Sequence, residues 1–217
     1  MLTLLTGILA GAFHVLSGPD HLAAVAPLAL LDRQRSWLAG WTWGLGHASG
    51  VVVVAAIAVL LRESLPPIDV ISTWSERLVG GALVALGLWG LRRSMQLRSG
   101  AHTHCGVVHD HLHVQSGPAW ARRLGHAHAS FCLGVLHGIA GSSHFLGVLP
   151  ALALPTRGAA LAYVAAFGVG TIVTMSAFAA LVGYAGTRAP RAHGAPRALL
   201  CTTAVAAIVV GGIWLVV

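Results

Sequence analysis

Six apolar segments, each long enough to cross about 30 Å of bilayer hydrocarbon, account for most of the chain. They run approximately over residues 2–31, 37–61, 74–91, 129–154, 158–184 and 197–217. Only 9% of the residues are charged and 56% are hydrophobic, whereas a soluble domain has about 25% charged residues. The sequence therefore predicts an all-α polytopic membrane protein with six transmembrane helices.

A short polar island interrupts the first apolar segment. Residues 14–21 read His-Val-Leu-Ser-Gly-Pro-Asp-His, with apolar sequence on both sides. An ionised carboxylate at the centre of a bilayer costs about 2.5–3.5 kcal/mol on insertion scales, so Asp20 marks a candidate functional site. Gly18 and Pro19 are expected to break or kink this helix, because proline lacks the N–H and clashes with the preceding turn.

The island recurs 123 residues later, at residues 137–144, as His-Gly-Ile-Ala-Gly-Ser-Ser-His. A second match aligns Trp-Gly-Leu-Gly-His at 43–47 with Phe-Gly-Val-Gly-Thr at 167–171. Each half then contains three spans, an odd number, so the halves are expected to insert with opposite topology around a midplane site. The equivalent pairs in the islands are His14 and His137, Gly18 and Gly141, and His21 and His144.

These features predict one transmembrane domain over residues 1–217. Repeat 1 covers about 1–93, a His-rich loop about 94–128, and repeat 2 about 129–217, with Gly141 as the helix-breaking position of the fourth segment. The loop is polar and compositionally biased. It is either an accessory metal-capture segment or a solvated tract. The candidate capture residues are His102, His104, His109, His111 and His113.

The arginine residues predict an orientation. Ten of the thirteen lie in the connections after the first, third and fifth segments, and positive residues favour the cytoplasmic side. The His-rich loop is therefore expected in the cytoplasm and both termini outside. A basic soluble protein would suggest nucleic acid as a partner. Here the arginines lie between apolar segments, so the bilayer is the expected partner and nucleic acid is not.

The polar positions of both halves suit a metal ion. His14 and His21 are seven residues apart and would face one side of a helix. Nitrogen and oxygen donors without thiolate suit Ni²⁺, Co²⁺ or Zn²⁺ better than Cu⁺. Asp20 is either a direct ligand or the group that fixes a histidine tautomer. Any one histidine alone could instead serve helix–helix hydrogen bonding. The candidate ligands are His14, Asp20, His21, His47, His137 and His144.

These motifs resemble a known family. Residues 14–21 resemble the His-x4-Asp-His signature of the nickel/cobalt transporters, and Leu-Gly-His-Ala-Ser at 45–49 resembles their Leu-Gly-His-Ser element. Residues 137–143 resemble the second-half motif of the six-helix UreH-type nickel permeases. The spacing here is one residue longer, His-x5-Asp-His. Ser142, Ser143 and His144 stand where the eight-helix transporters carry an acidic motif.

The resemblance implies a permease for Ni²⁺, or next Co²⁺, in a cytoplasmic membrane of bacterial type. It implies uptake that supplies a nickel enzyme, with export as the alternative because some relatives with His-rich loops export. No cofactor beyond the transported ion is expected, and the oligomeric state is not indicated.

Two other classes of function lack their residues. An intramembrane metalloprotease would need His-Glu-x-x-His, and no motif of a serine nucleophile surrounds the serines. A thiol or electron carrier would need paired cysteines, whereas Cys105, Cys132 and Cys201 are scattered. We therefore expect that the protein is not an enzyme.

Overall fold

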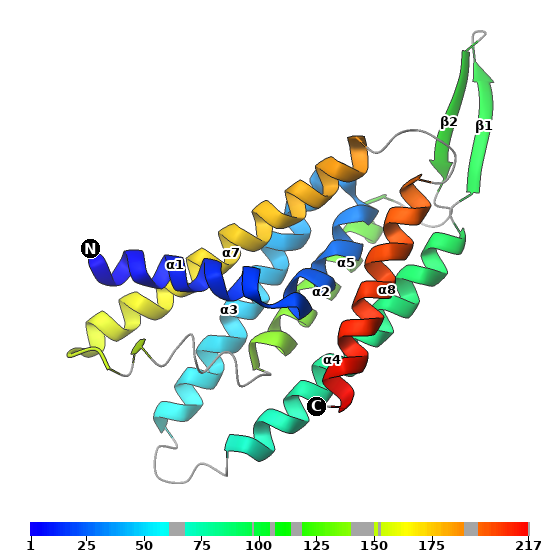
Figure 1. The fold of residues 1–217 in the computed structure, drawn as a ribbon. Helices are drawn as coiled ribbons and strands as arrows, with labels where there is room; N and C mark the ends of the chain where they lie inside the picture. The colour runs from blue at the N-terminus through cyan, green and yellow to red at the C-terminus, as the bar shows by residue number, and fades with distance from the viewer. Residues whose placement is uncertain are drawn as a thin grey trace.

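The computed structural model describes residues 1–60, 68–96, 98–104, 107–113, 119–139, 150–151, 153–188 and 195–216. Within these ranges the chain forms seven α-helices, one short 3-10 turn and one β-hairpin (Figure 1). The elements are α1 (Leu2–Ser17), α2 (Pro19–Leu31), η1 (Arg33–Arg35), α3 (Ser36–Leu60), α4 (Ile68–Gln96), β1 (Arg98–His104), β2 (Val107–His113), α5 (Ala119–Ile139), α7 (Arg157–Arg188) and α8 (Ala195–Val216).

The predicted break in the first apolar segment is confirmed. α1 ends at Ser17, Gly18 adopts an extended conformation with φ −93° and ψ 98°, and Pro19 is the first residue of α2. The two helices are bent by 77° with respect to each other. Proline is favourable at a first helical position, where its missing N–H is not needed. The corresponding break predicted at Gly141 lies outside the described residues.

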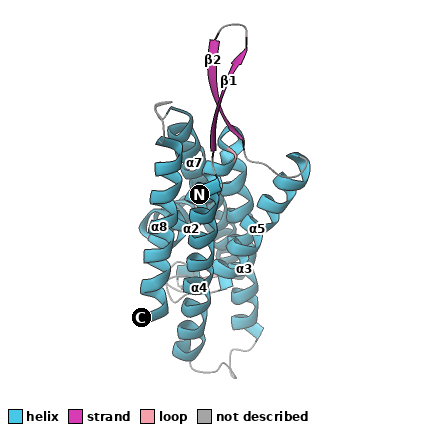
Figure 2. Ribbon diagram, turned by 90° about the vertical axis from the view of Figure 1, so that its right-hand side faces the viewer, coloured by secondary structure: helices cyan, strands magenta, loops and turns pink. Residues whose placement is uncertain are grey.

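Three elements differ from the predicted segments. α4 extends from 68 to 96 rather than 74 to 91, and α5 begins at Ala119 rather than near 129. Between them, part of the predicted irregular loop forms the antiparallel hairpin of β1 and β2. The hairpin stands beyond the ends of the helices in both views (Figures 1 and 2). The part of the chain that packs together is helical, as predicted.

Helices of the two halves pack against each other in an exchanged arrangement, in which each of the three main helix pairs combines one helix from each half. α1 lies against α7, α5 lies against α3, and α4 lies against α8 (Figure 1). The contacts recur at equivalent residues. A Cβ atom on Gly11 would collide with the carbonyl oxygen of Phe167, and one on Gly134 would collide with that of Trp43. Glycine at these points therefore lets the two backbones approach closely in both helix pairs, α1 with α7 and α3 with α5, as in membrane helix pairs.

Two further glycines make equivalent close contacts in the same helix pairs, but they belong to the partner helices, α3 and α7. A Cβ atom on Gly46 of α3 would collide with the carbonyl oxygen of Phe131 in α5. One on Gly170 of α7 would collide with that of Ile8 in α1. Gly46 and Gly170 are equivalent in the sequence alignment of the halves, and so are the two contacts.

Three parts of the chain have the length and hydropathy of a membrane span within the described residues. They are Arg157–Arg188 with mean hydropathy 1.9, Arg197–Val216 with mean hydropathy 2.3, and the bent pair of α1 and α2 if it is counted as one span. Large apolar side chains lie exposed on these helices, with Phe13 72% and Leu181 64% accessible. Exposed apolar side chains on helices of this length and hydropathy are typical of a membrane protein.

The ends of the arginine-rich connections meet at one end of the molecule. The Arg33 guanidinium Nη1 donates to the carbonyl oxygen of Gly186 over 3.0 Å, which joins the start of η1 to the end of α7. The Cys201 thiol donates to the Ser94 hydroxyl over 3.0 Å, which joins the first turns of α8 to the end of α4. The hairpin projects from this same end (Figure 1).

Candidate metal site

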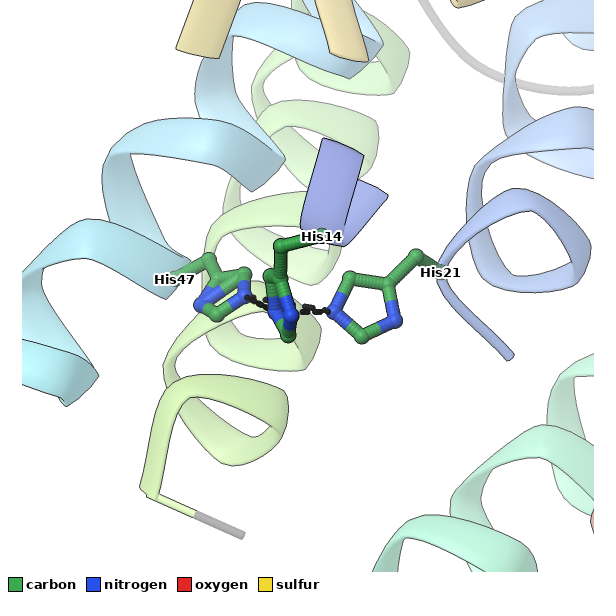
Figure 3. A group of neighbouring side chains, drawn as sticks. All are labelled: His14, His21 and His47. Carbon is green, nitrogen blue, oxygen red and sulfur yellow. Dashed lines mark hydrogen bonds between the residues drawn. The ribbon is translucent and has the colours of Figure 1, made fainter. Parts of the chain in front are cut away.

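Three imidazoles from three helices converge in the interior. His14 lies in the last turn of α1, His21 in the first turn of α2, and His47 in the middle of α3 (Figure 3). Their Nε2 atoms are 3.0 Å apart between His21 and His14, 3.2 Å between His14 and His47, and 3.3 Å between His21 and His47. All three side chains are buried. The break at Gly18 allows His14 and His21 to meet from helices that run in different directions.

This triangle of nitrogens has the geometry of a ligand set. Each imidazole nitrogen has one in-plane position, which holds either a hydrogen or a lone pair, so three hydrogen bonds cannot all form within the triangle. The three nitrogens are close enough together for one ion, with bonds of about 2.0–2.1 Å, to be held by all of them. His14, His21 and His47 are therefore the residues that would hold it.

Asp20 lies behind one of these ligands. Its Oδ1 is 2.9 Å from Nδ1 of His21, and Asp20 is only 2% exposed. A negative carboxylate beside Nδ1 favours the hydrogen on that nitrogen, which leaves the lone pair on Nε2, as in many metal sites. Asp20 also lies in the first turn of α2, where the positive end of the helix dipole stabilises an anion. The predicted Asp20 is thus beside the triangle but is not one of the three converging groups.

His137 of α5 lies next to the triangle. Its ring centroid is 5.8 Å from that of His21, and its side chain is 1% exposed. Nδ1 lies 2.9 Å from the carbonyl oxygen of Leu133, to which it can donate, and this tautomer leaves a lone pair on Nε2. Nε2 has no hydrogen-bond partner among the described residues. The remaining predicted ligand, His144, lies outside the described part of the chain.

Two aromatic residues line the site, and sequence reasoning missed their role. Trp43 is fully buried, and its ring centroid is 5.3 Å from His21, 5.0 Å from His47 and 5.4 Å from His137. Phe167 lies 5.5 Å from His14. The signal was available, because Trp43 and His47 are four residues apart and share one face of a helix. Trp43 and Phe167 are also equivalent in the two halves.

The other predicted site residues lie elsewhere. The five candidate capture histidines are on β1 and β2, outside the packed helices. Cys132 on α5 and Cys201 on α8 are free cysteines, so they form no redox pair with each other. Cys105 is outside the described residues. A thiol carrier therefore gains no support from the two cysteines that the structure describes.

No family model matches the chain, and no solved structure matches it significantly. It is 37% identical over 182 residues to the chloroplast protein FOR GROWTH AND FERTILITY 1 of Arabidopsis thaliana, and 35% identical over 179 residues to FOR GROWTH AND FERTILITY 2. These alignments cover 82% of this chain but 48% and 46% of the plant proteins, so the chain spans about half the length of these relatives. The urease accessory protein UreH of Bacillus sp. (strain TB-90) is 28% identical over 190 residues, which cover 84% of this chain and 77% of UreH. The chain is therefore a homologue of UreH and of the two chloroplast proteins, and the resemblance to UreH-type proteins is confirmed.

Proposed function

We propose that the protein is a permease that moves a divalent transition-metal ion, Ni²⁺ first and Co²⁺ next, across a membrane. The observation that carries the proposal is the triangle of Nε2 atoms of His14, His21 and His47, whose sides are 3.0–3.3 Å. Three neutral imidazoles bind first-row divalent ions well, and the converging group that the structure describes contains no thiolate to favour Cu⁺. Homology to a urease accessory protein supports a nickel cargo and a transporter rather than an enzyme.

The position of the triangle supports transport rather than storage. It lies at the break between two helix segments that together could form one span, and broken helices are where secondary transporters place their substrates. Three nitrogens fill only part of the coordination sphere of such an ion, so it could enter and leave by ligand exchange. We assign Asp20 the role of orienting His21.

We further assign His137 as the ligand that receives the ion from the triangle. Its unpartnered Nε2 and its 5.8 Å ring separation from His21 support this role. His137 does not belong to the group of converging ring nitrogens, so it would have to move to join His14, His21 and His47 in one set. His144 remains a proposed partner of His137 from the same half.

The architecture that we propose is a six-span inverted repeat, 3+3. α1 packs on α7 and α5 packs on α3, and in both pairs glycines at equivalent positions allow the backbones to approach closely. This packing supports a two-fold relation between the halves. The common end of the arginine-rich connections supports a cytoplasmic position for that end and an outside position for both termini. We place the protein in a cytoplasmic membrane of bacterial type.

Uptake of radiolabelled nickel by cells that express the chain tests the proposal. Expressing cells should accumulate nickel, and Co²⁺ should compete better than Zn²⁺. His47→Ala should remove this uptake at equal protein level, because it takes away one of three ligands. Uptake that is equal in the parent and in the His47→Ala variant would refute the proposed site.

Direction is tested with the same cells. Cells preloaded with nickel should lose it no faster when the chain is expressed, if the protein imports. Faster loss that depends on His47 would instead establish export, the alternative function. The observation that supports export as an alternative is the position of the His-rich hairpin at the arginine-rich end, because an exporter binds its ion on the cytoplasmic side.

A further inference from the structure

A buried threonine hydroxyl on α7 lacks a partner among the residues that the structure describes. Thr171 is 1% exposed, and its Oγ1 forms no hydrogen bond within the described ranges. Other helical hydroxyls, such as those of Thr42 and Ser176, donate to the carbonyl oxygen four residues earlier. Because buried polar groups normally have a hydrogen-bond partner, the Thr171 hydroxyl marks a place where the interior can bind a ligand.

Thr171 occupies the position in the second half that His47 occupies in the first. The sequence match between the halves pairs these two residues. A Cβ atom on Gly134 would lie 3.0 Å from the backbone nitrogen of His47, and one on Gly11 would lie 3.0 Å from that of Thr171. The two residues are therefore placed in the same way against a helix of the other half, α5 for His47 and α1 for Thr171.

The aromatic residues one turn before these positions are also placed equivalently. The ring centroid of Trp43 is 5.4 Å from that of His137. The ring centroid of Phe167 is 5.5 Å from that of His14. Each aromatic ring thus lies beside the first island histidine of the opposite half, as expected from a two-fold relation between the halves.

The helices that carry His47 and Thr171 also pack against each other, α3 against α7. A Cβ atom on Gly44 of α3 would lie 2.8 Å from the Cα atom of Ile172. One on Gly168 of α7, the equivalent glycine, would lie 3.4 Å from the Cβ atom of Ala48, the equivalent of Ile172. These reciprocal contacts support a two-fold axis that passes between α3 and α7.

We propose that Thr171 and His137 form a second ion position, weaker than the triangle, in the second half of the protein. The two-fold relation turns the contact between His47 and His14, whose Nε2 atoms are 3.2 Å apart, into a contact at the equivalent residues of the second half. Both of these residues have a buried polar atom without a partner in the described part of the chain, Oγ1 of Thr171 and Nε2 of His137. The equivalent of His21 lies outside the described residues, and the proposal does not depend on it.

The hydroxyl makes the second position weaker than the first. Imidazole nitrogen suits Ni²⁺, whereas neutral oxygen donors suit ions such as Mg²⁺, Ca²⁺ or Mn²⁺. Conduction requires binding that is favourable enough for an ion to enter and weak enough for it to leave. In the proposed permease, on which this inference rests, Thr171 therefore sets the strength of the position from which the ion is released.

Thr171→His tests the assignment by supplying the imidazole that the second half lacks. Full-length protein in detergent is dialysed against radiolabelled Ni²⁺, and the bound ions per chain are counted at a concentration that saturates the triangle. The variant should bind one ion more than the parent, and His137→Ala added to it should remove that ion. Thr202→His, on the exposed side of α8, is the matched control and should bind as the parent does. A folded Thr171→His protein without the additional ion would overturn the proposal.

Variants that do not enlarge the side chain test the hydroxyl itself. Thr171→Val keeps the shape and removes the hydroxyl, so maximal nickel flux should fall by about tenfold or more at an unchanged half-saturating concentration, since loss of a group that supports metal binding costs about 10–100-fold. Thr171→Ser keeps the hydroxyl and should retain most of the flux. A role in packing alone predicts the opposite order, because serine leaves a cavity. That order, or equal flux in all three proteins, would overturn the proposal.

The outcomes separate this inference from the permease itself. A parent protein that carries no nickel, with a Thr171→His variant that gains one ion held by His137, would refute transport and leave the second position intact. Transport that depends on His47, with Thr171 variants that bind and transport as the parent does, would do the reverse. If Thr171→His does not fold, the comparison of Thr171→Val with Thr171→Ser decides.

Discussion

Replacing Asp20 by asparagine should weaken nickel binding without abolishing it. The carboxylate oxygen lies 2.9 Å from Nδ1 of His21, in a place where Asp20 is 2% exposed. Asparagine keeps the shape of the side chain but loses the negative charge that favours the hydrogen on Nδ1 of His21. His21 would keep its place but bind less strongly.

The magnitude follows from the position of Asp20 beside a ligand. Loss of a group that supports a metal-binding histidine costs about 10–100-fold in affinity, or about 1.4–2.7 kcal/mol. His14→Ala removes one of the three converging nitrogens and should cost far more. His14→Ala is a better comparison than His21→Ala, because Asp20 contacts His21 and the loss of His21 would change the surroundings of both groups.

Competition between the purified protein and a chelator of known nickel affinity measures these differences. The chain should lack residues 101–113, so that the hairpin histidines do not contribute. Asp32→Asn, the same substitution beyond the other end of α2, is the matched control and should leave the affinity unchanged. An Asp20→Asn variant as weak as His14→Ala would mean that Asp20 is itself a ligand. One as strong as the parent would mean that the carboxylate does not support His21.

Three more outcomes are expected. His14→Ala should abolish nickel transport at normal expression, whereas His193→Ala, between α7 and α8 in the sequence, should leave transport nearly unchanged. Equal effects of the two variants in a flux assay would contradict the proposed role of the triangle. Deletion of residues 101–113 should leave measurable flux and alter its dependence on metal concentration, and complete loss at normal expression would contradict this. Ile68→Cys should react with an impermeant thiol reagent from outside and Ser99→Cys only after permeabilisation, and the reverse pattern would invert the orientation.

Local sequence patterns were enough to predict the part of the site that lies on α1, α2 and α3. The break between α1 and α2 falls at the glycine and proline expected to cause it, and His14, His21 and His47 were all candidate ligands from their place in apolar segments. Helical periodicity and the chemistry of imidazole are enough for that much. The role of Asp20 depends on a distance of 2.9 Å to one ring nitrogen, which no spacing in the sequence gives.

Other features escaped prediction for identifiable reasons. The hydropathy pattern placed the ends of this segment at 74 and 91, because Arg92, Arg93 and the polar residues near the start of α4 are unfavourable in lipid. These residues are nevertheless compatible with a helix, and α4 continues through them. The hairpin was hidden because polar composition was treated as a sign of an irregular loop, while the alternation of its histidines is typical of a strand. The packing of helices from one half against helices of the other is marked in the sequence only by the glycines at the points of close contact.

The exchanged packing has a consequence for the order in which the site forms during synthesis. All three converging histidines belong to the first 47 residues, but α1, which carries His14, packs mainly against α7, which ends at Arg188. At about 5–20 residues per second, the ribosome needs about 7–28 s to travel from one point to the other. During that interval the nascent chain holds its imidazoles without the helix that keeps one of them in position. The triangle can therefore have its final arrangement only after α7 has packed against α1, and a chain that stops before α7 would carry all three histidines without the helix that supports His14.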